Sequence, residues 1–218
     1  TRAVLKGKSN ASLAVGLVIA VALWGGNNVG TKWLVGSWPP IWTGGSRFFC
    51  AGLLLLAVLR VTTWFGQYVV PSRELSRALW VRGGLSLAAY IVAFNFALRY
   101  TSASHVALYL GASPIWALLW EAGSERIMIG WARWGAALLA LSGVGVLLAP
   151  ALAGSNVSLA GELFGLMTSV LWTSYGRQSR KLTATLNGAE VSAHTMWRAG
   201  LILLPLGFVE VARQGLPI

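Results

Sequence analysis

The chain has 218 residues, of which 56% are hydrophobic and only 11% are charged. A soluble domain of this length has fewer apolar side chains and more charges, so the composition excludes a soluble globular protein and predicts an integral membrane protein. Apolar and polar residues do not alternate strictly, as they do in the strands of a membrane barrel. The expected spans are therefore helices.

Seven apolar stretches approach the ~20 residues that a helix needs to cross the hydrocarbon core of a bilayer. The predicted fold class is an all-α polytopic helical bundle, in which Pro71 and Ser72 precede a short surface helix between the second and third spans. The predicted spans are residues 12–31, 41–59, 83–99, 104–121, 131–149, 160–177 and 190–209.

The formal net charge of +11 is compatible with nucleic-acid binding, but the positions of the basic residues argue against it. Most of them lie on one side of the predicted bundle, which by the positive-inside rule is the cytoplasm. We therefore expect an inner-membrane protein with a cytoplasmic N-terminus, whose partners are the lipid bilayer and a small-molecule substrate. The basic residues on this side are Arg2, Lys6, Lys8, Arg60, Arg73, Arg77, Arg82, Arg126, Arg133, Arg177, Arg180 and Lys181, against Lys32, Arg99 and Arg213 on the other.

Polar side chains share one face of the first predicted span. Trp24, Asn27, Asn28 and Thr31 follow one another at positions i, i+3, i+4 and i+7, the spacing of a single helical face. Such a face either lines a cavity or bonds to neighbouring helices. Trp24, Asn27 and Asn28 are candidate substrate-binding residues.

The second and seventh spans each contain an arginine, Arg47 and Arg198. A charge at the centre of a bilayer costs at least ~2.5 kcal/mol on insertion scales. Each guanidinium is therefore expected to snorkel to the interface, to pair with backbone carbonyls or to contact a substrate carboxylate. Both arginines are predicted to have structural or gating roles.

The third span contains two further candidates for substrate binding, Tyr90 and Asn95. They are five residues apart, about 140° around a helix, so they are not expected to face one narrow site together. Asn95 is the costlier of the two to leave against lipid, and Tyr90 also fits an apolar core.

One face of the fourth span is lined with polar and aromatic groups. Tyr109, Ser113 and Trp116 are candidate substrate-binding residues on this face, while Trp120 also fits a headgroup anchor. Pro114 lacks a backbone donor, and the carbonyls that it frees must find partners or line a wet cavity. Pro114 is therefore a candidate structural residue.

The sixth span repeats the pattern of the first, because Trp172 and Tyr175 follow Trp24 and Asn27 by 148 positions. Arg47 and Arg198 are 151 positions apart, so the two pairs are separated by nearly the same number of residues. This predicts a first repeat of five spans at residues 10–150 and the start of a second at residues 158–218. A five-span repeat inverts its topology, and a complete pair has ten spans, so we expect three more spans after Ile218.

The sequence gives no sign of a metal site, a cofactor or an enzyme. His105 and His194 are isolated from other ligands, and neither a phosphate-binding loop nor a nucleophile with a base is recognisable. A membrane enzyme that acts on lipid is therefore disfavoured. With no aspartate in the chain, a buried carboxylate relay for protons is not predicted, because the glutamates near the spans lie at their ends, at Glu121, Glu162, Glu190 and Glu210.

Several segments together resemble the drug/metabolite transporter superfamily, and in particular its proteins with EamA-type repeats. They are LWGGNNVGTKW in the first span, the run from Pro40 to Phe48, FALRYTSASHVALYLGASPIWALLWE across the third and fourth spans, and WGAALLALSGVGVLL in the fifth. The resemblance implies ten helices in two inverted repeats, with both termini in the cytoplasm. It also implies export of amino acids or other small metabolites.

The expected function is the export of small neutral or zwitterionic metabolites, most simply aromatic or other apolar amino acids, by alternating access. The first, third, fourth and sixth spans are expected to line the substrate cavity. A multidrug or other metabolite carrier of the same fold stays open as an alternative, as does a membrane adaptor that transports nothing.

Overall fold

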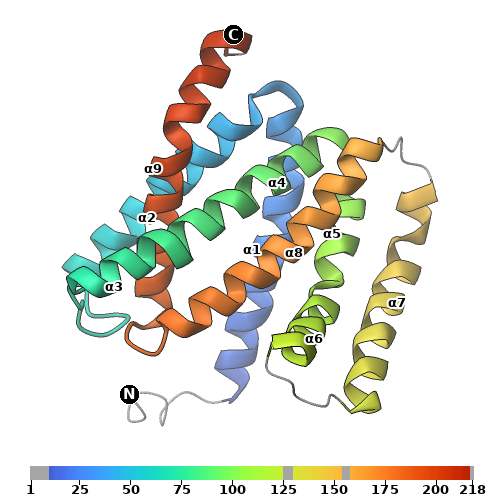
Figure 1. The fold of residues 1–218 in the computed structure, drawn as a ribbon, viewed down its shortest axis with the longest axis horizontal. Helices are drawn as coiled ribbons and strands as arrows, with labels where there is room; N and C mark the ends of the chain where they lie inside the picture. Colours follow the sequence, from blue (N-terminus) through green and yellow to red (C-terminus); the bar gives the residue numbers. More distant parts are fainter. Residues whose placement is uncertain (1–9, 125–129, 154–157, 217–218) are drawn as a thin grey trace.

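The computed structural model describes residues 10–124, 130–153 and 158–216, which contain helices and no strand (Figure 1). The all-α prediction is therefore confirmed for this part of the chain. Arg2, Lys6, Lys8 and Arg126, on which the predicted orientation partly depends, lie outside the described residues. The helices are α1 (Asn10–Ser37), α2 (Pro40–Val61), α3 (Arg73–Ala78), the π-helical η2 (Leu79–Leu85), α4 (Ser86–Tyr100), α5 (Ala103–Gly111), α6 (Ser113–Ser124), α7 (Trp131–Ala153), α8 (Leu159–Leu182) and α9 (Gly188–Gln214).

Helices occupy all seven predicted spans, with two differences in detail. The short helix expected on the cytoplasmic surface is α3, and it runs without a break through η2 into α4. Of the described helices, four are long and apolar enough to cross a membrane: Ala14–Ser37, Pro40–Val61, Arg73–Tyr100 and Gly188–Gln214.

The fourth predicted span is divided into α5 and α6 at Ala112. Pro114 has no N–H to donate to the carbonyl of Leu110, so the helical ladder is interrupted there. The hydroxyl of Ser113 donates to that carbonyl instead, at 2.6 Å. The carbonyl freed by Pro114 is thus satisfied inside the protein, as expected for a helix break at membrane depth.

Short side chains cap several helices, whereas α2 is capped from another helix. Ser72, Ser102, Ser158 and Asn187 accept bonds from the first turns of α3, α5, α8 and α9. At α2 the N-cap is Pro39, which offers no such acceptor. The carboxylate of Glu210 on α9 accepts from the backbone N–H groups of Ile41 (2.8 Å) and Trp42 (3.1 Å), so α9 completes the start of α2.

The most extensive helix contact joins α2 to α9, which cross in Figure 1. Glycine makes the crossing close. A Cβ added at Gly52 lies 2.3 Å from the backbone N of Trp197, and one added at Gly200 lies 2.5 Å from the N of Phe49. Real side chains do not approach so closely, so both positions require glycine for the observed packing.

Beside this pair, α4 and α8 run side by side, and α5, α6 and α7 lie beyond α8 (Figure 1). The main core lies between these layers. It is built around Ile91, Phe94 and Leu98 of α4, Val106 of α5 and Leu203 of α9, all at most 2% exposed. This core holds α4 between α9 and α8 and so fixes two walls of the site described below.

We predict that Gly200→Ala and Gly52→Ala each lower the free energy of unfolding by about 1–3 kcal/mol, because the new methyl group overlaps backbone atoms. Gly143→Ala on α7 is the matched control, since no heavy atom lies within 4 Å of its added Cβ. Thermal unfolding in detergent measures the effect. Equal stability of all three variants contradicts the close crossing.

Candidate functional site

A cavity of about 320 Å³ lies among five helices and is mostly aromatic. Its walls come from α1, α2, α4, α8 and α9. The sequence predicted the contributions of α1, α4 and α8, but it did not predict those of α2 and α9, and α5 and α6 contribute none. The lining residues are Trp24, Asn27, Arg47, Phe48, Leu87, Tyr90, Phe94, Trp172, Tyr175, Ser192 and Met196.

Trp172 is the centre of the aromatic wall. Its ring stacks on Trp24 with centroids 5.7 Å apart, and it also contacts Tyr90 at 4.9 Å and Tyr175 at 5.8 Å. The hydroxyl of Tyr175 is bonded to Thr195 on α9, 3.0 Å away, which holds its ring in place. Large rings fixed in this way give a rigid apolar surface at a low entropic cost on binding.

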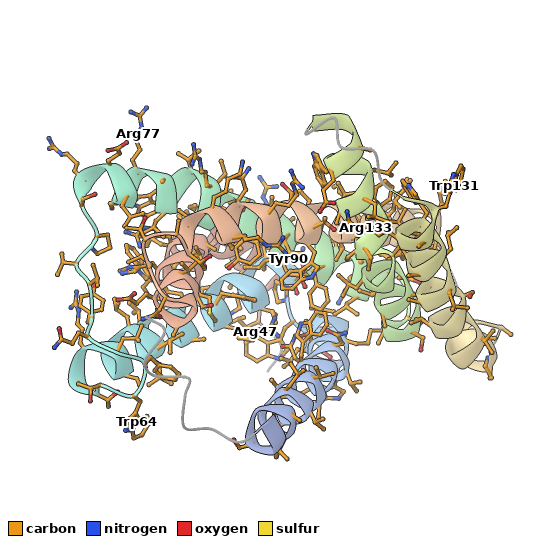
Figure 2. The ribbon with its side chains drawn as sticks, turned by 90° about the horizontal axis from the view of Figure 1, so that it is seen from below. Arg47, Trp64, Arg77, Tyr90, Trp131 and Arg133 are labelled. Atoms are coloured by element: carbon orange, nitrogen blue, oxygen red, sulfur yellow. The ribbon has the colours of Figure 1, made fainter. Side chains whose placement is uncertain are left out.

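Arg47 is the charged side chain of the cavity among the described residues that line it. Figure 2 shows Arg47 and Tyr90 inside the assembly, whereas Trp64, Arg77 and Trp131 lie on its outside. The guanidinium of Arg47 donates to the hydroxyl of Thr31 and lies over the ring of Phe48, 5.3 Å from its centroid. These contacts leave guanidinium donors available to a ligand.

Asn27 and Asn28 occupy adjacent places with different surroundings. Asn27 is half-buried and lines the cavity. Asn28 is buried and does not line it, and its Oδ1 has no hydrogen-bond partner among the described residues. Of the polar face predicted on the first span, Trp24 and Asn27 therefore reach the cavity directly, while Thr31 acts on it through Arg47.

Asn95 lies outside the cavity, contrary to its candidacy for substrate binding. Its side chain is fully buried, and its Nδ2 donates to the carbonyl of Pro40 at 2.7 Å. Tyr90, five residues earlier, faces the cavity instead. Because the two residues are well separated around α4, Tyr90 faces the cavity and Asn95 faces α2.

The candidates from the fourth span also lie away from this cavity. Tyr109 donates to the carboxylate of Glu162, and the Nε1 of Trp116 is buried without a partner among the described residues. Ser113 and Pro114 line a second hollow of about 310 Å³, between α6 and α8, which shares Trp172 with the first cavity. Trp172 thus separates two hollows, and the expectation that the fourth span lines the same cavity as the others is not met.

Arg198 is buried in the protein rather than exposed to the cavity. Its Nη1 donates to the backbone carbonyl and to the Nδ1 of His194, each at 3.0 Å, and its Nη2 to the hydroxyl of Ser76 at 3.2 Å. The guanidinium also lies 4.3 Å from the ring centroid of Trp197. Of the three roles considered for this arginine, the structure shows pairing inside the protein.

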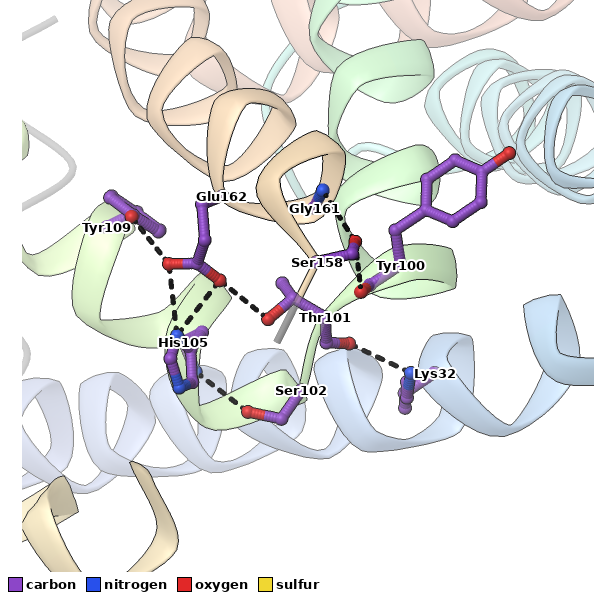
Figure 3. Close-up of polar contacts among 9 residues, drawn as sticks. All are labelled: Lys32, Tyr100, Thr101, Ser102, His105, Tyr109, Ser158, Gly161 and Glu162. Carbon is purple, nitrogen blue, oxygen red and sulfur yellow. Dashed lines mark hydrogen bonds and ion pairs between the residues drawn. The ribbon is translucent and has the colours of Figure 1, made fainter. Parts of the chain in front are cut away.

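The sequence did not predict a polar cluster at the start of α8 (Figure 3). The carboxylate of Glu162 accepts from the hydroxyls of Thr101 (2.8 Å) and Tyr109 (2.6 Å), and the Nδ1 of His105 lies 3.0 Å away. His105 and Tyr109 are four residues apart in the fourth predicted span and so share one helical face, which was a usable signal. Their partner was missed because Glu162 is more than 50 positions away in sequence.

The fold and the cavity define a polytopic helical membrane protein with a largely aromatic cavity among its helices. The model of the EamA-like transporter family matches residues 12–149, more than half of the chain. The chain therefore belongs to the EamA-like transporter family, part of the drug/metabolite transporter superfamily. No curated protein matches it. The family indicates a membrane transporter of small metabolites rather than an enzyme.

We predict that Asn95→Ala and Asn27→Ala distinguish a residue that stabilises the fold from a residue that lines the cavity. Asn95→Ala removes a buried bond between α4 and α2 and should lower the free energy of unfolding by about 1 kcal/mol. Asn27→Ala faces open space in the cavity and should leave the unfolding temperature unchanged. Thermal unfolding of the two purified variants tests this, and equal losses of stability contradict it.

Proposed function

We propose that the protein exports small neutral or zwitterionic metabolites, most simply aromatic or other apolar amino acids, across the inner membrane. The observation that carries the proposal is the cavity, in which six aromatic side chains and one guanidinium face the same space. Its volume of about 320 Å³ falls at the small end of ligand pockets, which suits a single amino acid.

Each part of such a substrate has a counterpart on the cavity wall. Trp24, Trp172 and Tyr90 enclose the apolar side chain, and the guanidinium of Arg47 binds the carboxylate. Asn27 offers a carbonyl oxygen to the ammonium group. One positive charge in an apolar chamber disfavours cationic substrates and is too little for multiply phosphorylated ones.

Contacts between equivalent positions support two inverted repeats, at residues 10–150 and 158–218. Trp24 and Trp172, 148 positions apart, stack on one another. Phe49 and Gly200, 151 positions apart like the two arginines, meet at the crossing of α2 and α9. Equivalent residues of two repeats meet on their two-fold axis, so both contacts are those expected of such an axis beside the cavity. Rocking of the repeats about it is the proposed route to alternating access.

The distribution of basic residues supports a cytoplasmic N-terminus. Arg82 and Lys181 line one hollow together, so the loops predicted to be cytoplasmic lie at the same end of the protein. Lys32 and Arg99 lie together elsewhere: Lys32 donates to the carbonyl of Leu98 at the end of α4, and Arg99 to that of Val35 at the end of α1. The structure thus keeps the two charge groups apart, as the positive-inside rule requires.

We predict that the protein in proteoliposomes transports labelled neutral amino acids saturably, and that Trp172→Ala and Asn27→Leu each lower the flux at least about tenfold, the effect of losing roughly 1.4 kcal/mol of binding. Trp64→Ala is the matched control, since its ring is 81% exposed and remote from the cavity. A panel of aromatic, aliphatic, basic and acidic amino acids measures the specificity.

Unchanged flux in both cavity variants contradicts the proposed site. Flux of apolar drugs in place of amino acids selects the multidrug alternative. No flux of any compound, together with wild-type behaviour of Asn27→Leu in cells, selects the adaptor.

We predict that Arg47→Gln distinguishes carboxylate binding from a purely structural role. The glutamine retains a hydrogen bond to Thr31 but loses the positive charge. The variant should raise KM for a neutral amino acid roughly tenfold and leave KM for the corresponding amino amide within about twofold. Equal changes for both compounds contradict contact between Arg47 and the carboxylate.

A further inference from the structure

Glu162 is bonded to side chains from two neighbouring elements (Figure 3). Thr101, at the end of α4, donates to its Oε1, and Tyr109 of α5 donates to its Oε2. His105 of α5 places its Nδ1 3.0 Å from Oε1 and 3.1 Å from Oε2. A carboxylate beside an imidazole is a pair that exchanges a proton readily, because histidine changes charge between about pH 5 and pH 8.

The second histidine of the chain has the opposite environment. The Nδ1 of His194 lies 3.0 Å from Nη1 of Arg198 and accepts a bond from it. A proton on that nitrogen removes the bond and places two cations side by side. The imidazole of His194 therefore faces a cation, whereas that of His105 faces a carboxylate.

The other charged groups that the structure describes on the elements around this cluster have partners of their own or are exposed. Lys32 of α1 donates to the carbonyls of Leu98 and Thr101, at 2.7 and 2.8 Å. Arg133 of α7 is paired with Glu121 of α6 at 2.8 Å. Of the remaining elements against α8, α4 contributes Arg99, bonded to α1 carbonyls, and η2 contributes Arg82, which is exposed. The basic residues of α8 itself, Arg177, Arg180 and Lys181, lie at its other end.

The position of the cluster connects it to the cavity. Glu162 joins α8, which carries Trp172 and Tyr175, to the end of α4, which carries Tyr90 and Phe94. It also joins α8 to α5, whose Tyr109 ring is so close to Gly165 that an added Cβ lies 2.5 Å from it. A change in the bonds of Glu162 therefore acts on two walls of the cavity at one end.

We infer that the Glu162–His105 pair binds one proton and that its binding and release are coupled to transport through the cavity. In the deprotonated pair, neutral His105 donates Nδ1–H to the carboxylate. An incoming proton converts the imidazole to an imidazolium, which holds the carboxylate by a charge-assisted bond, so α5 is attached more tightly to α8. The imidazolium releases the same proton on the other side of the membrane when the walls move apart. The inference depends on the proposed carrier function.

Two transport assays in proteoliposomes test the coupling, with the labelled neutral amino acid that gives the highest flux. Counterflow without a pH gradient measures carrier function alone, and accumulation under an imposed gradient measures coupling. For one proton per substrate, a gradient of one pH unit supports up to about tenfold accumulation. We expect this accumulation in the wild type and in the control variant Glu121→Gln, which removes the carboxylate that is paired with Arg133.

Glu162→Gln and His105→Asn retain hydrogen-bonding groups at their positions but lose the proton site. Both should keep counterflow within about twofold of the wild type and lose the response to the gradient. A purely structural role for Glu162 predicts instead that Glu162→Gln keeps the response. Counterflow in the wild type without any gradient response overturns the proton site and leaves the carrier intact.

A measurement without substrate tests proton binding independently of the proposed transport function. The purified protein in detergent is shifted from about pH 8 to about pH 6, and an indicator dye counts the protons taken up. The wild type should bind about one proton more per chain than His105→Asn. Equal uptake overturns the inference, whereas the expected difference together with absent counterflow of every substrate overturns the transport proposal alone.

Discussion

The close crossing of α2 and α9 is the contact on which the rest of the structure depends. Lipid tails are as apolar as leucine side chains, so helices in a membrane are held by close packing and by polar bonds rather than by the hydrophobic effect. Gly52 and Gly200 allow backbones to touch, and Glu210 of α9 binds the first N–H groups of α2. Both kinds of contact thus act between the same two helices, which present Arg47 and Phe48 on one side and Ser192 and Met196 on the other to the cavity.

Arg47 and Arg198, which the sequence pattern predicts to be equivalent, have different surroundings. Arg198 is enclosed by His194, Ser76 and two tryptophan rings, so its charge is compensated within the protein. Arg47 has the hydroxyl of Thr31 and the face of Phe48, and it borders open space. One arginine is therefore a structural group and the other is directed at the cavity, a division that their shared sequence pattern does not reveal.

The sequence predicted the helices and about half of the cavity, and the misses have physical causes. Helical periodicity determines which residues share a face, so Trp24 with Asn27 and Trp172 with Tyr175 were placed correctly relative to one another. It does not determine what a face meets. Asn95 faces α2, Tyr109 faces Glu162, and the walls from α2 and α9 include Phe48, Ser192 and Met196, which no sequence pattern marked as candidates. Partners distant in sequence decide these outcomes, and a single sequence carries no record of them.

The surroundings of the glutamates differ from those that their positions in the sequence suggest. All of those near predicted spans lie at helix ends, where a carboxylate ordinarily reaches water or the headgroups. Instead Glu190 and Glu210 are buried, and their carboxylates accept bonds from backbone N–H groups of loops and helix starts, which favour a negative charge there. Glu162 differs from both because its partners are side chains, the hydroxyls of Thr101 and Tyr109 and the imidazole of His105. Backbone N–H groups hold the carboxylates of Glu190 and Glu210, whereas the bonds of Glu162 join α8 to the end of α4 and to α5. A change in these bonds therefore reaches two of the helices that line the cavity, α4 and α8, from one end of the protein.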